Sequence, residues 1–270
     1  MTVRRALGAA RARLTRRRAV RRFTGDYATW DEARAASRGY DDEAILEKVK
    51  QATLHVRAGD AAYERDSVVF DTIQYSWPVL AGLLWAASRS RNRLNVLDFG
   101  GSLGTSYRQN RQLLEHLDEL RWNVVEQESY VRVGRELFQT EELRFYSSID
   151  ACASDTQPNV VLVSSSLAYV PQPYAVLDAL LRHAFEYLIV DRTAFLPDRD
   201  RLTVQNVPPW IYDASYPAWF LHERRFLDAV DRVYDRVAEF DALEGSFDLG
   251  DATARSKGFI FERRAGLTSP

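Results

Sequence analysis

The residues best suited to chemistry in this sequence lie where an apolar run ends in Asp98 and a turn with three glycines follows, up to Gly104. Glycine lets a backbone turn sharply and come close to a ligand, because it has no Cβ. A second carboxylate, Glu126, ends another short apolar run 28 positions after Asp98. Two acids beside such a turn predict a pocket for a cofactor that contains a nucleoside.

The turn itself discriminates between cofactors. From Gly100 it follows G-x-S-x-G, whereas dinucleotide turns follow G-x-G-x-x-G and bring backbone amides against a pyrophosphate. The chain has only three lysines, none of them in a Walker-type phosphate loop. Asp98 would repel a diphosphate but suits a cofactor with an ammonium and a sulfonium group. The electrostatics therefore favour S-adenosylmethionine over NAD or a nucleoside triphosphate, with Glu126 accepting hydrogen bonds from the ribose hydroxyls.

Several longer strings carry a family resemblance. They are Tyr63-Glu-Arg-Asp-Ser67, Tyr75-Ser-Trp-Pro78, Leu97-Asp-Phe-Gly-Gly-Ser-Leu-Gly104, Trp122-Asn-Val-Val-Glu-Gln127, Asp191-Arg-Thr193 and Val207-Pro-Pro-Trp-Ile-Tyr212. On these residues the chain resembles the class I S-adenosylmethionine-dependent methyltransferases, and more closely a bacterial family often associated with surface-polysaccharide gene sets. Ser102 departs from the superfamily pattern, since it stands where the turn commonly has its middle glycine.

The resemblance and the general rule for open parallel sheets place the site at the carboxyl ends of the strands. The expected cofactor contacts are Arg65, Asp98, Gly100, Gly101, Ser102, Gly104, Glu126, Gln127, Ile149, Asp150 and Ser164. Among them, Ile149 is expected to form a wall for adenine and Asp150 to contact the adenine amino group. Arg65 is expected either to hold the methionine carboxylate or to form a structural pair at the surface. Asp191 and His222 are the candidate bases for a hydroxyl acceptor. The segment Asp191-Arg-Thr193 is expected either to face the acceptor or to hold a loop through an internal ion pair.

A segment rich in aromatic residues and proline, 204–221, precedes the last predicted helix. As a lid it would present Trp210, Tyr212, Tyr216 and Trp219 to a ring-shaped acceptor; as part of the core the same side chains would cap apolar residues. The predicted function is O-methylation of a small molecule or saccharide, including a cell-surface polysaccharide precursor. The alternative is a noncatalytic adaptor of the same fold in a polysaccharide assembly complex. No nucleic-acid recognition motif is present, so no nucleic-acid partner is expected.

The elements that must position these residues alternate regularly from Leu94 onward. Expected strands are Asn95–Phe99, Trp122–Glu126, Leu143–Tyr146, Asn159–Ser164, Tyr187–Asp191, Tyr234–Phe240 and Phe259–Glu262. Strands that alternate with helices predict an α/β, Rossmann-like fold, with a mostly parallel seven-stranded sheet and helices on both faces. The resemblance implies that the last strand is reversed.

The chain divides into a basic arm (1–25), a helical lead-in or cap (26–92) and the Rossmann-like domain (93–270). In the lead-in, one helix is expected to begin at Asp41 or Asp42 and end near Gly59. A second helical region, Ser67–Ser90, is expected to break or restart at Pro78.

The arm holds nine of the 36 basic residues and no acid, which leaves 27 basic and 38 acidic residues in the rest. Val3, Leu7, Ala10 and Leu14 form a thin apolar stripe in it, which fits either an anionic membrane surface or a solvated arm.

Length and composition limit the classes of protein to which the chain can belong. With 270 residues and 46% hydrophobic side chains, the chain can bury a full core. A single cysteine, Cys152, excludes an intrachain disulfide and is compatible with a reducing cytoplasm. The expected location is therefore cytoplasmic, and a membrane-binding arm would place the protein at the inner face of the membrane. The four histidines lack ligand-like spacing, so no metal site is expected.

Overall fold

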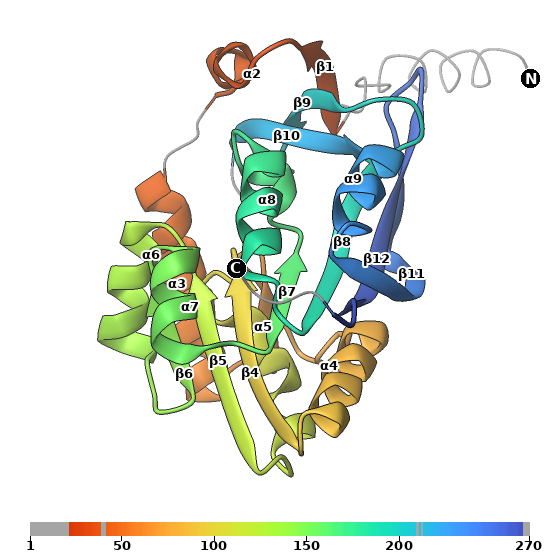
Figure 1. Cartoon of the computed structure of the whole chain (residues 1–270). Helices are drawn as coiled ribbons and strands as arrows, with labels where there is room; N and C mark the ends of the chain where they lie inside the picture. Colours follow the sequence, from red (N-terminus) through yellow and green to blue (C-terminus); the bar gives the residue numbers. More distant parts are fainter. Residues whose placement is uncertain (1–21, 39–41, 209–210, 212, 267–270) are drawn as a thin grey trace, which may run out of the picture.

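The computed structural model describes residues 22–38, 42–208, 211 and 213–266, and its centre is a sheet in which the predicted strands lie side by side (Figure 1). Their order is β6-β5-β4-β7-β8-β12-β11. These strands are β4 (Arg93–Phe99), β5 (Glu119–Val125), β6 (Leu143–Tyr146), β7 (Val160–Ser164), β8 (Tyr187–Leu196), β11 (Tyr234–Asp248) and β12 (Thr253–Arg263). β12 runs antiparallel to both of its neighbours, so the reversed last strand implied by the resemblance is confirmed.

The prediction of seven strands is too low, because the sheet has ten strands within the described residues. β1 (Phe23–Tyr27), β9 (Arg201–Asn206) and β10 (Ser215–His222) extend it beyond the predicted set. The connection is β8, which was expected to end at Asp191 but continues to Leu196. At Arg192 the backbone has a φ of 52°, and the register of β8 with β12 shifts there. Such a bulge bends a strand, and the end of β8 then pairs with β10 in place of β7.

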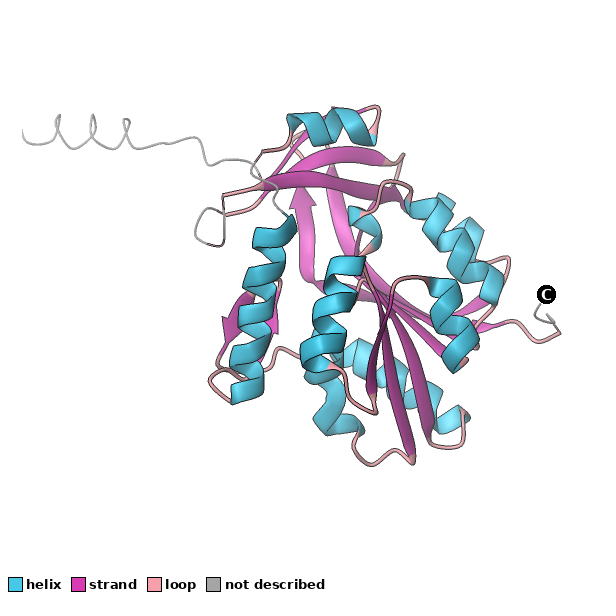
Figure 2. Cartoon of the chain, turned by 90° about the vertical axis from the view of Figure 1, so that its left-hand side faces the viewer, coloured by secondary structure: helices cyan, strands magenta, loops and turns pink. Residues whose placement is uncertain are grey.

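Two layers of helices bury the two faces of the sheet (Figure 2). Side chains alternate along each strand, so Val96 enters one core and Leu97 the other. One face is covered by α3 (Asp42–Ala58), α4 (Trp77–Arg89), α5 (Thr105–Asn110), η1 (Arg111–Leu114), α6 (Glu128–Val133) and η2 (Gly134–Phe138). The other is covered by α7 (Ile149–Thr156), η3 (Leu167–Tyr169), α8 (Pro173–His183) and α9 (Glu223–Val230). No helix in these described ranges has the length and apolarity needed to cross a membrane.

The extra strands form a separate layer above the carboxyl ends of the parallel strands (Figure 1). We call β1, β9, β10 and the helix α2 (Trp30–Ala36) the roof. The roof has its own small cores: α2 packs Ala33 onto β9, and Phe23 packs against Phe220 of β10 and Phe247 of the long β11–β12 hairpin. The roof therefore encloses the edge of the sheet where ligands of open α/β folds bind.

The lead-in is only partly helical. α3 ends before Gly59, whose φ of 83° terminates it, as predicted. The helical region predicted from Ser67 is wrong in its first part, because β2 (Tyr63–Arg65) and β3 (Val68–Phe70) form a hairpin. Its two turn residues, Asp66 and Ser67, both have positive φ, which matches the twist of a tight hairpin. The helix then starts afresh at Trp77 with Pro78 in its first turn, as expected.

Candidate functional site

The glycine turn leaves β4 and enters α5 through three residues with positive φ. These are Gly100 at 71°, Ser102 at 57° and Gly104 at 93°. A Cβ on Gly100 would overlap the side chain of Ser166, and a Cβ on Gly101 would overlap the carboxylate of Asp98. The turn is thus wedged between a strand-end acid and the loop after β7, and only glycine fits these two positions.

The backbone amides of this turn are bound within the protein. Gly100 N–H donates to the carbonyl of Val125 at 2.9 Å, and Gly104 N–H donates to that of Gly101 at 3.0 Å. Ser102 N–H donates to Oε1 of Glu126 at 3.2 Å. A dinucleotide fold needs such amides for the pyrophosphate. Here these three amides already have acceptors, one of which is a carboxylate.

Two acids flank the turn. Asp98 is 1% exposed and accepts a hydrogen bond from the Trp122 indole at 2.9 Å; its burial raises its pKa to about 7. Glu126 follows β5, and its Oε2 accepts the amide of Gln127 at 2.9 Å. Burial also raises the pKa of Glu126, against the stabilising effect of the Gln127 and Ser102 amides. Burial removes hydrogen bonds between these carboxylates and water. A positively charged or hydroxyl-bearing ligand could replace those hydrogen bonds.

One large cavity, of about 1180 Å³, joins this turn to the roof. Its lower half contains the turn together with Asp98, Glu126, Gln127, Ser147 and the Ser164–Ser166 loop. Its upper half contains Tyr169, Gln205, Tyr216 and Trp219. Pockets for single small molecules typically measure about 300 to 1,000 Å³. This cavity has room for a cofactor and for a second molecule beside it.

No model of a known protein family matches the chain, and no curated protein matches it. Among solved structures, the chain is similar to the N-terminal domain of EvdMO1 with SAH bound. The match covers 83% of this chain and 98% of the EvdMO1 domain, at 12% identity and a TM-score of 0.45. Magnesium protoporphyrin IX methyltransferase from Synechocystis with bound SAM matches 84% over 99%, at 14% identity and a TM-score of 0.42. The glycopeptide N-methyltransferase MtfA complexed with sinefungin matches 68% over 85%, at 13% identity and a TM-score of 0.44. At this level of similarity, function has to be inferred from the cavity itself.

The structure brings most of the predicted cofactor residues to one cavity. Those that line it are Arg65, Asp98, Gly100, Gly101, Ser102, Glu126, Gln127 and Ser164. Gly104 does not line it, and serves as the N-cap position of α5. Ile149 and Asp150 also lie outside the lining, because α7 begins at Ile149. Ile149 packs into the core, while the exposed Asp150 binds His183 at 2.7 Å, so their predicted adenine contacts find no support in the geometry.

The two candidate bases have different surroundings, and neither lines the cavity. The amide of His222 donates to Asp200 at 2.7 Å where β10 passes into α9, away from the lining residues. Asp191 is 3% exposed and lies behind Ser164, whose Oγ donates to Asp191 Oδ2 at 3.1 Å. Its Oδ1 has no hydrogen-bond partner among the described residues, and burial raises the pKa of Asp191 to about 6. Ser164 thus connects a buried carboxylate to the cavity.

Arg192, next to Asp191, lines the cavity as the strand-end prediction implied. It also forms the ion pair that was the alternative reading of this segment. Its guanidinium contacts Glu244 at 2.5 Å and Asp66 at 3.1 Å, and thereby ties β8 to β11 and to the β2–β3 turn. Its charge is therefore already neutralised within the protein.

Sequence reasoning missed most of the roof. Tyr216 and Trp219 were expected in a loop, but they lie in strand β10. Gln205 of β9 connects the two tyrosines that line the upper half of the cavity. Its Oε1 accepts a hydrogen bond from the Tyr169 hydroxyl at 2.8 Å, and its Nε2 donates to Tyr216 Oη at 3.3 Å. Trp210 and Tyr212 lie outside the described residues, as does the arm up to residue 21. The period-2 pattern of 201–206 is the signal that could have revealed β9.

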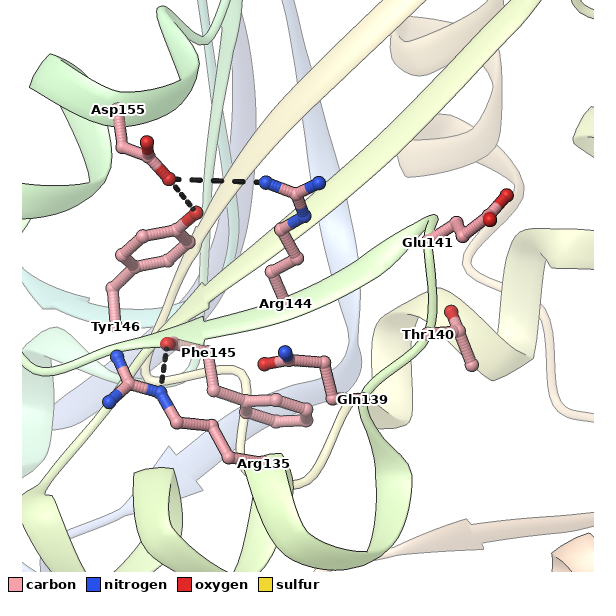
Figure 3. A pocket seen from close by; sticks show the side chains of 8 residues that line it. All are labelled: Arg135, Gln139, Thr140, Glu141, Arg144, Phe145, Tyr146 and Asp155. Atoms are coloured by element: carbon pink, nitrogen blue, oxygen red, sulfur yellow. Dashed lines mark hydrogen bonds and ion pairs between the residues drawn. The ribbon is translucent and has the colours of Figure 1, made fainter.

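A second hollow, of about 580 Å³, lies at the edge strand β6 (Figure 3). Three of its polar side chains interact: the Tyr146 hydroxyl donates to Asp155 at 2.6 Å, and Arg144 lies 4.0 Å from the same carboxylate. Arg135 Nε donates to the Phe145 carbonyl at 3.0 Å. An edge strand exposes unpaired backbone groups, and side chains of this kind protect them. The hollow therefore has a structural explanation.

Proposed function

We propose that this protein is an S-adenosylmethionine-dependent methyltransferase. The observation that carries the proposal is the glycine turn, in which the Ser102 amide is bound by the Glu126 carboxylate. A diphosphate at this turn would meet occupied amides and the charges of Asp98 and Glu126. A sulfonium cofactor has no diphosphate and carries positive charge, so the same features favour it.

The residues present fit such a cofactor. A carboxylate offers about four acceptor sites, and the amides of Ser102 and Gln127 use two of those on Glu126. The remaining two suit the pair of ribose hydroxyls. Ser166 lines the cavity beside Gly100, and its buried hydroxyl has no partner among the described residues, so it can hydrogen-bond the ligand. When bound, S-adenosylmethionine supplies an electrophilic methyl group.

The acceptor is best interpreted as a hydroxyl compound. Methyl transfer to oxygen needs close placement of the nucleophile and a group that receives its proton. Ser164 Oγ can accept a hydrogen bond from an acceptor hydroxyl while it donates its own proton toward Asp191 Oδ2. With a pKa of about 6, Asp191 is mostly ionised at neutral pH and can serve as the final proton acceptor.

A saccharide fits the upper half of the cavity. The aromatic residues Tyr169, Tyr216 and Trp219 line this half together with the amide of Gln205. Sugar rings present apolar faces and hydroxyl edges, which match aromatic rings and amide or hydroxyl groups respectively. We therefore propose O-methylation of a small molecule or saccharide, which includes precursors of cell-surface polysaccharides.

Titration calorimetry tests the cofactor, and isotope transfer tests the reaction. We expect saturable binding of S-adenosylmethionine and its demethylated product, and much weaker binding of NAD. With a donor labelled in its methyl group, the label should appear on an oxygen of a saccharide acceptor. Saturable NAD binding without S-adenosylmethionine binding would overturn the cofactor, and label on nitrogen or carbon would overturn the O-methylation.

A further inference from the structure

The upper half of the cavity has a charge opposite to that of the lower half. Its wall includes Arg22, Arg34 and Arg38, all on or beside the roof. The acids that line this half are Glu244 and Asp66, and both are bound by Arg192. Within the described residues, none of the three roof arginines forms an ion pair with a carboxylate. They therefore leave uncompensated positive charge in this half of the cavity.

Backbone hydrogen bonds place two of these arginines on the same cross-section of the roof. The carbonyl of Arg22 accepts the amide of Asn206 at 2.7 Å, and the carbonyl of Arg38 accepts the amide of Ser215 at 2.8 Å. Asn206 and Ser215 face each other across β9 and β10. Arg22 and Arg38 thus flank this pair at three strand spacings, or about 14 Å between their backbones. Both residues are exposed and line the cavity, so an anionic group bound between them could be reached from two sides.

The surroundings of the three arginines allow an interaction with an anion. The Arg22 guanidinium lies 5.4 Å from the ring centre of Phe23 and 5.2 Å from that of Phe247. Trp30 of α2, the helix that carries Arg34, lines the same part of the cavity. The three arginines are themselves exposed at the cavity wall, so a ligand can reach them from solvent. A guanidinium group can donate two parallel hydrogen bonds to one phosphate, so arginine favours phosphate over other anions of the same charge.

We propose that the acceptor is a phosphorylated saccharide whose phosphate or diphosphate is held by Arg22, Arg34 and Arg38; this inference rests on the methyltransferase function proposed above. The sugar then occupies the aromatic wall near Tyr169 and Tyr216, with its reactive hydroxyl toward Ser164. The phosphate stays at the roof. Both a sugar nucleotide and a lipid-linked sugar diphosphate have this chemistry.

Calorimetry with small probes tests the proposal on the full chain. Inorganic pyrophosphate should bind saturably, and glucose 1-phosphate should bind more tightly than glucose, from which it differs only by the phosphate. UDP-glucose and detergent-solubilised farnesyl diphosphate distinguish a nucleotide carrier from a lipid carrier. Arg22→Gln, Arg34→Gln and Arg38→Gln should each weaken pyrophosphate binding roughly tenfold.

Arg182→Gln is the matched control, because Arg182 is exposed on α8 and has no ion pair among the described residues. It removes the same charge far from the roof and should leave pyrophosphate binding unchanged. Equal affinity for glucose and glucose 1-phosphate, wild-type pyrophosphate binding in all three roof variants, or an equal loss in Arg182→Gln would each overturn the proposal.

Parallel titrations with S-adenosylhomocysteine separate the two levels of inference. Normal S-adenosylhomocysteine binding in the roof variants shows that they are folded. If that ligand fails to bind the wild-type protein while pyrophosphate binds through the arginines, the cofactor assignment fails and the anion site stands. If it binds and pyrophosphate does not, the anion site alone fails.

Discussion

Replacing Glu126 with glutamine tests the cofactor site with the smallest change in shape. The carboxylate now accepts two backbone amides, at 3.2 Å from Ser102 and 2.9 Å from Gln127. In Glu126→Gln one oxygen becomes an NH₂ group, which donates and cannot accept. At least one of the ribose contacts or turn contacts is then lost, and the others lose the strength that the charge gave them.

The expected cost follows from that count. A hydrogen bond to a charged group contributes about 1.5 to 3 kcal/mol. Losing one such bond to the ligand lowers S-adenosylmethionine affinity by a factor of roughly 10 to 150, since each 1.4 kcal/mol is tenfold. The free energy of unfolding should change far less, because burial already raises the pKa of Glu126 and thus disfavours its charge. Removing the charge offsets the lost amide contact.

Calorimetry and thermal unfolding measure these two effects separately. Glu128→Gln is the control, because Glu128 is exposed in the first turn of α6, two residues away, and undergoes the same chemical change. It should bind S-adenosylmethionine like the wild type. Wild-type affinity in Glu126→Gln would refute the ribose assignment. A large fall in melting temperature would show that Glu126 acts mainly on the turn.

Gly101→Ala should lower S-adenosylmethionine affinity and cost about 1 to 3 kcal/mol of stability in denaturant unfolding, because its Cβ overlaps the Asp98 carboxylate; unchanged binding would contradict this. With an Asp98 pKa of about 7, cofactor affinity should rise between pH 6 and 8. Because this pKa lies above its unfolded value, the Asp98 contribution to stability should fall as pH rises from about 4 to 7; Asp98→Asn should remove both trends in calorimetry and unfolding. Asp191→Asn should lower turnover and remove a step near pH 6 from its pH profile, with cofactor affinity unchanged; wild-type turnover would exclude Asp191 as the base. Deleting residues 1–21, which hold eight arginines, should abolish flotation with anionic liposomes, as should high salt; persistent flotation would place the contact elsewhere.

The parts of the site that sequence could predict are those built from neighbouring residues. The apolar run, the acid and the glycines of the turn are contiguous, and Glu126 ends the next strand of the same unit. Because strands and helices alternate, the strands run parallel and their carboxyl ends lie at the same edge of the sheet. For this reason residue types alone were enough to name many of the residues that line the lower half of the cavity.

The loop after β6 shows how a local signal was overlooked. Ile149 and Asp150 were expected to contact adenine from the loop after this strand. Ser148 accepts the amide of Ala151 with its side chain at 3.1 Å and so caps a helix that begins at Ile149. Serine followed by a helix-compatible stretch is a recognised start signal. Only Ser147 remains on the cavity wall.

The roof could not be predicted because its pairing is distant in sequence. Phe23 pairs with Gln205, and the first of these residues was assigned to a charged arm. Proline removes a backbone donor and is uncommon inside a sheet. In β10, however, Pro217 pairs with β9 on one side only, and pairing with β8 is confined to Leu221 and His222. The missing donor therefore breaks no hydrogen bond of the sheet.

This separation of the cavity into two halves has a consequence for how the site works. The lower half is fixed by the ends of parallel strands, and its acids suit a cationic donor. The upper half comes from the roof, which joins the first described residues to the segment between β8 and α9 and presents arginine. On the proposed function, opposite charges on donor and acceptor attract across the cavity, so each ligand should favour binding of the other. The roof packs mainly through its own small cores, so substitutions at its inward side chains can change the acceptor while the turn and Glu126 keep the donor in place.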